Sequence, residues 1–195
     1  MRAAEDDPTH RESPRAPAEV GRRLFETRTV LVFGEVTTEL AENISAQLLA
    51  LAARGDEPIL VLVHSPGGHV EAGDTIRDVV RFIRPEVRMI GSGWVASAAA
   101  LLFCGAERAH RVCLPNTRFL LHQPLGGMHG HASDIEIEAA QILAMRARLN
   151  RIFAEATGQP YDKVARETER NLWMTATEAV EYGLVHRIIE RASDI

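Results

Sequence analysis

Short apolar runs alternate with stretches of helical periodicity along this chain. Apolar runs of strand length occupy residues 30–33, 59–63 and 87–90. The first two runs precede segments in which apolar side chains recur every three or four residues, and a later run at 118–121 precedes a long helical pattern over 132–157. This alternation of strands and helices predicts an α/β chain.

Capping signals give the ends of two helices. Thr38 can cap a helix over 38–54. Near the C-terminus, Thr175 and Glu178 form the S/T-x-x-E capping box of a short helix, after which we expect a strand at 185–189.

A glycine-rich segment follows the third apolar run. We expect Gly91 and Gly93 to turn the chain after Ile90. The small side chains from Ser97 to Leu102 then favour a buried helix. Ser97 would therefore stand where the chain enters a helix.

Length and composition predict a single domain. The chain has 195 residues, of which 46% are hydrophobic, and this is enough for one substantial core. Residues 1–20 combine charges and prolines and contain no apolar stretch, so we expect a disordered N-terminal tail instead of a signal peptide or membrane anchor. The single domain would then span residues 21–195.

Charge and cysteine usage narrow the partners and the compartment. The formal net charge is −5 and Lys and Arg are not concentrated in one place, which argues against nucleic acid and favours protein or peptide partners. Cys104 and Cys113 lie in or beside apolar runs and not at a zinc-binding spacing. We expect buried, reduced thiols in a cytoplasmic protein without a membrane partner.

Two polar clusters are better explained without a ligand. His129 and His131 are expected to face solvent, and we assign neither a metal nor another cofactor. Arg146, Arg148 and Arg151 are expected to pair with glutamates of their own helix instead of binding an anion.

The segment around Ser97 carries the most informative chemistry. At the start of a helix the serine hydroxyl would be presented at the edge of the sheet, and the Ala98 amide would be free to donate to a developing oxyanion. Taken alone, the segment is explained more simply by a serine that only starts a helix.

Two further segments favour a catalytic role for that serine. Gly67 and Gly68 follow the run at 59–63, so an extended peptide could lie along their backbone and the Gly68 amide could supply a second oxyanion donor. His122 follows the run at 118–121, where it could act as general base for a serine beside a neighbouring strand. Three such segments at the carboxyl ends of predicted strands favour a serine peptidase over a tight turn and a structural histidine.

Six segments of the chain stand in an order and spacing shared with one known family. They are Ser65-Pro66-Gly67-Gly68, Ala96-Ser97, Cys113-Leu114-Pro115-Asn116, His122-Gln123-Pro124-Leu125-Gly126-Gly127, Asp134-Ile135-Glu136-Ile137 and Glu178-Ala179-Val180-Glu181-Tyr182-Gly183-Leu184-Val185. Through them the chain, from Leu24 to its C-terminus, resembles the proteolytic subunit of the Clp protease, ClpP.

The resemblance implies a ClpP/crotonase-type α/β fold of repeated β-β-α units, with the helix from Ala132 as a projecting handle through which two rings meet. It also implies peptide hydrolysis inside two stacked heptameric rings, which are homo- or hetero-oligomeric. An AAA+ Clp unfoldase would supply unfolded protein or peptide substrates to this chamber.

The resemblance also implies a role for each site residue. Ser97 corresponds to the nucleophile and His122 to the base. Gly68 and Ala98 correspond to the oxyanion donors. Substrate-binding residues would be Gly67, Leu125 and Gly126, whose backbone would flank the bound peptide.

The chain departs from the family at the third catalytic position. The aspartate of the triad falls on Asn171, which has no charge to stabilise an imidazolium. An Asn carbonyl can still accept the ring N–H, as it does in Cys-His-Asn proteases, and Glu167 or Glu169 could also approach. We expect an ATP-dependent Clp-type serine endopeptidase whose activity Asn171 could attenuate.

Other departures concern the substrate pocket and the docking surface. Ala98 replaces a bulkier methionine, which would widen the local pocket. Leu60 and Leu62 stand where the family often carries aromatic residues that line the pockets for unfoldase loops, although Phe82 remains aromatic. This subunit would dock an unfoldase poorly, or would work beside a different ClpP-like subunit that docks for it.

Two other functions stay open at this point. The chain could be a catalytically weak or inactive ClpP-like ring subunit that regulates or docks for an active paralogue, as Asn171 suggests. It could also be an acyl-CoA enzyme of the related crotonase architecture, which uses a similar oxyanion hole but would make the pairing of Ser97 with His122 a coincidence.

Overall fold

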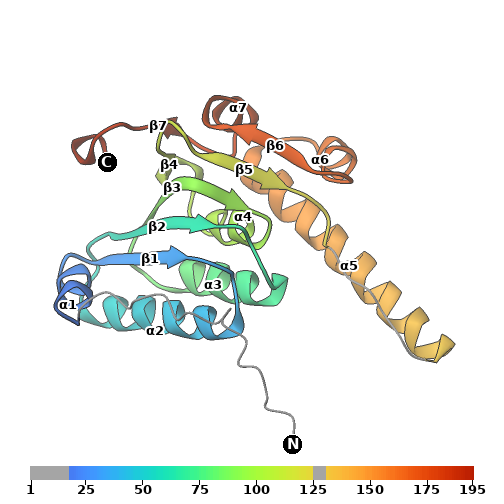
Figure 1. The fold of residues 1–195 in the computed structure, drawn as a ribbon, viewed down its shortest axis with the longest axis horizontal. Coiled ribbons are helices and arrows are strands. Elements are labelled where there is room, and N and C mark those ends of the chain that lie inside the picture. Colours follow the sequence, from blue (N-terminus) through green and yellow to red (C-terminus); the bar gives the residue numbers. More distant parts are fainter. Residues whose placement is uncertain (1–17, 125–130) are drawn as a thin grey trace, which may run out of the picture.

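A largely parallel sheet forms the centre of the computed structural model, which describes residues 18–124 and 131–195 (Figure 1). The strands are β1 (Thr29–Phe33), β2 (Ile59–Ser65), β3 (Val87–Ala96), β4 (Arg111–Cys113), β5 (Arg118–Leu121), β6 (Leu172–Thr175) and β7 (Arg187–Ile188). Within the described residues the sheet runs in the order β1-β2-β3-β4-β7, while β5 pairs with β3 and, antiparallel, with β6. The α/β class expected from the sequence is confirmed.

Helices α2, α3 and α4 lie on the same side of the sheet (Figure 1). The helices are α1 (Ala18–Glu26), α2 (Thr38–Arg54), α3 (Val70–Phe82), α4 (Ala98–Phe103), α5 (Ala132–Thr157), α6 (Tyr161–Glu167) and α7 (Ala176–Tyr182). On β1, Val30 and Val32 are buried, whereas Leu31 and Phe33 point the other way and are exposed. Across the described segments no helix combines the length and the apolar character needed to cross a membrane.

Strand β3 changes partners along its length, and this change positions the site. Its first half pairs with β4 and its second half pairs with β5. The turn expected after Ile90 is therefore wrong, because the strand continues to Ala96. Gly93, with a φ of 57°, lies against the ring of His64, and a Cβ atom there would collide with that ring. Glycine serves close packing at this point and not a turn.

The capping signals near both ends of the chain correspond to real helix ends. The capping box of Thr175 and Glu178 is present, with both reciprocal hydrogen bonds. The cap of α2 is Thr37 and not Thr38, because the Thr37 hydroxyl accepts from the Leu40 amide at 3.1 Å. At the C-terminus, the strand expected at 185–189 is reduced to the two residues of β7.

Helix α1 begins inside the segment assigned to the tail. The helix starts at Ala18, so residues 18–20 are helical. The rest of that segment, residues 1–17, lies outside the described part of the chain.

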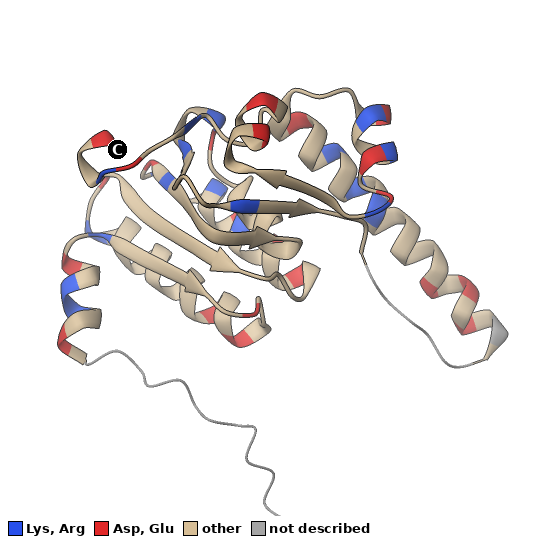
Figure 2. Ribbon diagram, turned by 45° about the horizontal axis from the view of Figure 1, so that its top comes forward, with Lys and Arg blue, Asp and Glu red and all other residues tan. Residues whose placement is uncertain are grey.

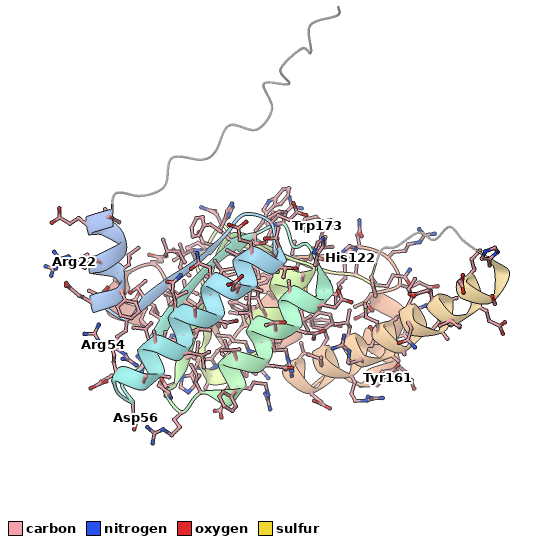
Figure 3. The ribbon with its side chains drawn as sticks, turned by 90° about the horizontal axis from the view of Figure 1, so that it is seen from below. Arg22, Arg54, Asp56, His122, Tyr161 and Trp173 are labelled. Atoms are coloured by element: carbon pink, nitrogen blue, oxygen red, sulfur yellow. The ribbon has the colours of Figure 1, made fainter. Side chains whose placement is uncertain are left out.

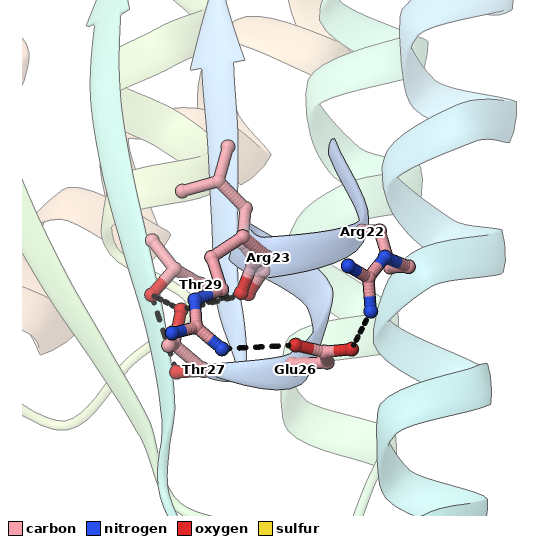
Figure 4. A network of polar contacts seen from close by, with 6 residues as sticks. Arg22, Arg23, Glu26, Thr27 and Thr29 are labelled. Carbon is pink, nitrogen blue, oxygen red and sulfur yellow. Dashed lines mark hydrogen bonds and ion pairs between the residues drawn. The ribbon is translucent and has the colours of Figure 1, made fainter. Parts of the chain in front are cut away.

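Surface contacts organise the end of α1. Arg22 and Arg23 form ion pairs with Glu26 at 2.8 and 3.4 Å, and the Thr27 hydroxyl donates to the Arg23 carbonyl at 3.1 Å (Figure 4). Exposed ion pairs of this kind contribute little to stability. No residue of α1 is fully buried, and Phe25 attaches the helix to the body by packing against the core.

Charged residues lie mainly on the helices and loops around the sheet (Figure 2). Helix α5 projects away from the body, and its exposed first half carries acidic residues (Figures 1 and 2). Its buried side chains begin at Leu149 and Asn150, close to where the helix meets the body.

Candidate active site

Ser97 lies between β3 and α4, at the helix start that its sequence context predicted. Its backbone has a φ of 56° and a ψ of −120°, which a residue with a side chain rarely adopts. Its amide donates to the Leu120 carbonyl at 2.9 Å, so the serine is tied to β5. The strained turn at Ser97 is held by the sheet on both sides.

His122 lies within hydrogen-bond distance of this serine. Its Nε2 atom is 2.8 Å from Ser97 Oγ. Ala96 pairs with Leu120 across β3 and β5, so both side chains follow the carboxyl ends of adjacent parallel strands. Burial lowers the pKa of His122, and a hydrogen bond with Asn171 offsets part of this shift. The neutral imidazole favoured here is the form that can accept the serine proton.

Asn171 stands across from His122 where β6 begins. Leu121 pairs with Leu172 in the antiparallel register, which leaves His122 and Asn171 opposite each other one step further on. The Asn171 side chain is exposed, and its interaction with the imidazole raises the pKa of His122 against the larger effect of burial. Trp173, two residues further along β6, pairs with Leu120, and Figure 3 labels both Trp173 and His122. The asparagine thus occupies the place of a third catalytic residue but brings no charge.

Two glutamates near this position could have supplied the missing charge, but their observed hydrogen bonds are made to other groups. Glu167 accepts a hydrogen bond from the Tyr182 hydroxyl at 3.0 Å. The backbone carbonyl of Glu169, and not its carboxylate, contacts the loop after β5 by accepting from Gln123 at 2.8 Å.

Gly67 packs directly against the serine. Its φ is +99°, and a Cβ atom there would lie 2.7 Å from Ser97 Cβ and 2.7 Å from the Ala96 carbonyl oxygen. It would also lie 3.2 Å from the Ala98 amide nitrogen. Only glycine can adopt this φ value and let the backbone come this close to Ser97.

Two backbone amides beside the serine are free to donate. Val36 holds the diglycine turn, since its amide donates to the Gly67 carbonyl at 2.8 Å and its carbonyl accepts from His69 at 2.8 Å. Within the described residues, neither the Gly68 amide nor the Ala98 amide, at the start of α4, has a backbone acceptor. Two such donors near a nucleophile can stabilise an oxyanion.

A cavity of about 460 Å³ opens beside Ser97 and His122. Its apolar lining includes Val70 from α3, Leu120 and Pro124 near the end of β5, and Ile142 and Met145 from α5. The cavity therefore offers an apolar site next to the nucleophile.

The short side chain of Ala98 does not open into this cavity. Ala98 is buried, and the cavity that it lines together with Leu149 and Phe153 holds only about 10 Å³. The widening expected from an alanine at this position is small because these larger side chains occupy the space.

Sequence reasoning missed the residues that support Asn171. The Gln123 backbone amide donates to the Thr168 carbonyl at 2.8 Å, and the Thr168 hydroxyl donates to Asn150 Oδ1 at 2.9 Å. These contacts join the segment after β5, the end of α6 and the base of α5, and so hold the turn that leads to Asn171. Asn150, a polar residue within the apolar stripe of the long helix, was the signal available in the sequence.

The structure brings together Ser97, His122, Asn171, Gly67 and the amides beside them. Leu125 and Gly126, predicted to bind the peptide, lie outside the described residues, as do Gly127 and His129.

Comparison with known proteins agrees with this arrangement. The model of the Clp protease family matches residues 13–192. The chain is 53% identical to the ATP-dependent Clp protease proteolytic subunit 3 of Rhizobium etli over the full length of both chains. It is 55% identical to the proteolytic subunit 2 of Gluconobacter oxydans, over 98% of this chain and 86% of that one.

A solved structure shares the fold. An Asn-to-Asp mutant of ClpP1 from Listeria monocytogenes matches with a TM-score of 0.84 and 48% identity, over 89% of this chain and 98% of that chain. Fold and sequence thus define a member of a serine peptidase family. The chain belongs to the Clp protease family, among its proteolytic subunits, as its motifs indicated.

Proposed function

We propose that this protein is a serine endopeptidase subunit that hydrolyses peptide bonds of unfolded proteins. The observation that carries the proposal is the 2.8 Å distance between Ser97 Oγ and His122 Nε2. The free amides of Gly68 and Ala98 beside the serine support it, because a Ser-His pair without oxyanion donors would be a weak catalyst.

The chemistry is nucleophilic acyl transfer. Ser97 Oγ attacks the scissile carbonyl carbon while His122 Nε2 takes the hydroxyl proton, and the amides of Gly68 and Ala98 donate to the oxyanion. His122 then gives the proton to the leaving amine. Water, deprotonated by His122, cleaves the acyl-serine ester and restores the enzyme.

The substrate is an extended segment of unfolded chain. Its backbone runs along Gly67, which has no side chain to obstruct it, and Leu125 and Gly126 are its further binding residues. The side chain next to the scissile bond enters the apolar cavity of about 460 Å³.

Asn171 makes this a slow peptidase. An imidazolium forms in each step, and a neutral amide stabilises it less than a carboxylate does. In trypsin-type enzymes the change from Asp to Asn lowers turnover about 10⁴-fold, largely through the wrong histidine tautomer. Here the position of Asn171 opposite His122 supports a smaller loss, since an Asn carbonyl that accepts the ring N–H would hold the productive tautomer.

The subunit works in two stacked heptameric rings in the cytoplasm, with an AAA+ Clp unfoldase as partner. Three half-buried leucines support a docking surface: Leu60, Leu62 and Leu114, which pack over the buried cluster of Ile90, Val112 and Ile189. Phe82, at the end of α3, is 79% exposed. Because these leucines are aliphatic, they lack the aromatic side chains that could stack on an unfoldase loop, and the contact would be less specific.

The second candidate is a catalytically weak or inactive ring subunit that regulates or docks for an active paralogue. The neutral, exposed Asn171 favours it. A hetero-ring would place this chain beside a subunit with its own complete triad.

Labelling with a fluorophosphonate, read by intact mass, separates these functions. The native chain is expected to gain one adduct, Ser97→Ala none, and Asn171→Asp one adduct at a higher rate. Labelling of Asn171→Asp alone would select the regulatory subunit. Labelling of neither, in folded protein, would overturn the peptidase assignment.

A further inference from the structure

The cavity beside Ser97 lies between two helices that are distant in sequence. Val70 and Glu71 from the first turn of α3 line one side, and Ile142 and Met145 from α5 line the other. Helix α5 projects from the body (Figure 1). The width of the cavity therefore depends on how the base of α5 is held against α3.

One ion pair joins these two helices close to the cavity. Arg148 Nη1 lies 2.5 Å from Asp74 Oδ2. Asp74 follows Val70 by one helical turn, and Arg148 follows Met145 by nearly one turn, so each partner stands on the same helix face as a wall residue. In the part of the chain that the structure describes, no other ion pair involves α5.

The ion pair acts where α5 leaves the body. Residues 133–141 of the helix are exposed, and its fully buried side chains begin at Leu149, directly after Arg148. A change in tilt at this point moves Met145 and Ile142, which lie further out along the helix. The ion pair is thus placed to control the outer wall of the cavity.

The buried carboxylate of Asp74 would be unfavourable without its partner Arg148. Its side chain is only 13% exposed, whereas that of Arg148 is 45% exposed. Burial raises the pKa of Asp74, and the hydrogen bond and charge of Arg148 act in the opposite direction. A carboxylate this buried needs a charged donor at bonding distance, which constrains the two helices more sharply than an apolar contact would.

We propose that Asp74 and Arg148 are positioning residues that hold α5 against α3 and thereby set the width of the substrate cavity. The inference rests on the proposed peptidase function, because it assigns the cavity to the substrate side chain next to the scissile bond. Neither residue touches the substrate. Loss of the ion pair weakens peptide binding, while Ser97 and His122 stay in place because β3 and β5 hold them.

Kinetics of peptide cleavage test the inference in the full-length protein. Asp74→Asn and Arg148→Gln are each expected to raise KM about tenfold, within the range of pairwise couplings in contacting networks. We expect kcat and the rate of fluorophosphonate labelling to change by less than about twofold, because the transition-state groups are untouched. Arg148→Gln is the safer variant for folding, since the arginine is half exposed.

Two further variants separate positioning from general stability. The reversed pair, Asp74→Arg with Arg148→Asp, is expected to bring KM back to within about threefold of the native value, since the attraction is restored. Arg146→Gln, on the same helix and in no ion pair among the described residues, is the matched control and should leave KM unchanged. A folded Asp74→Asn with native KM, or a reversed pair that restores stability but not KM, would refute the inference.

A binding measurement keeps this test independent of turnover. In Ser97→Ala, the affinity for a fluorescent extended peptide is read by anisotropy with and without Arg148→Gln. Equal affinities would overturn the positioning role, whereas an affinity about tenfold weaker would support it even in a subunit that does not label. Absence of labelling would count only against the peptidase assignment.

Discussion

The two halves of the candidate site are held by different parts of the fold. Ser97 and Gly67 belong to the middle of the parallel sheet, where Gly67 packs on the serine and the neighbouring Ala96 and Ala98 are buried. His122 and Asn171 belong to the antiparallel edge formed by β5 and β6, where Asn171 is exposed. Packing around Gly67 leaves no space for a side chain in the buried half, whereas Asn171 in the exposed half is an amide at a position with few packing contacts.

A side chain at Gly67 should displace Ser97 and so disrupt the buried half of the site. Gly67→Ala would place a Cβ atom 2.7 Å from Ser97 Cβ at a φ of +99°, and we expect at least about a hundredfold loss of turnover, as displacements near 1 Å in an active site can cause. The measurement is peptide cleavage by folded variant protein.

Gly34 offers the matched control for this change. It has a φ of +82°, but nothing lies within 4 Å of a Cβ atom placed there. Gly34→Ala should cost about 1–2 kcal/mol of stability through its backbone conformation and leave turnover nearly unchanged. Equal losses of turnover in both variants would mean that backbone strain, and not contact with Ser97, limits the buried half.

In the exposed half, the loss of one supporting hydrogen bond should lower turnover by a smaller factor. Gln123→Ala removes the side-chain hydrogen bond to the Glu169 carbonyl, and we expect about a tenfold loss of turnover, with about 1 kcal/mol of stability, because Asn171 loses a support. Gln47→Ala, which removes a helix-surface hydrogen bond to Asn43, should cost no turnover. Unchanged turnover in Gln123→Ala would show that the turn before β6 holds Asn171 without it.

The smallest effect is expected in the pH dependence of kcat/KM. Burial lowers the pKa of His122, so the acid limb of kcat/KM should lie below the usual histidine range. Asn171→Asp should move this limb up by about one unit, because a carboxylate favours the imidazolium. An unshifted limb would mean that residue 171 does not act on the imidazole.

The lowered pKa of His122 also predicts the direction in which stability changes with pH. The unfolded chain binds a proton at the ordinary histidine pKa, and the folded protein binds it only at lower pH. As the pH falls through the unfolded value, the unfolded state takes up more protons and the native protein loses stability. Denaturant unfolding across this range checks the direction.

The sequence predicted the long elements better than the short ones. Apolar periodicity was enough for β1, β2, β5 and α5. Strands β4 and β6 were not expected, because runs this short show no period of their own and become strands through their partners; the equally short β5 was expected from its apolar run. The continuation of β3 beyond Ile90 has the same cause, since it depends on β5 and on the ring of His64 over Gly93.

For the site, local motifs located the reacting groups but not their supports. Ser97, His122 and the diglycine stand in short motifs that can be read along the chain. The contacts of Gln123 and Thr168 join separate elements and have no local signature. Arg148 was expected to pair with glutamates of its own helix, and this was wrong: it pairs with Asp74, whose burial only the packed fold determines.

The most direct test of the account is the turnover of the native protein compared with Asn171→Asp on one fluorogenic peptide, with Ser97→Ala as blank. The account predicts slow cleavage by the native chain that exceeds the blank, and a gain of about 10²–10⁴ in Asn171→Asp, up to the size of the loss seen when trypsin-type triads lose the charge. Equal turnover in the native chain and Asn171→Asp would contradict the claim that the missing charge at residue 171 limits this enzyme.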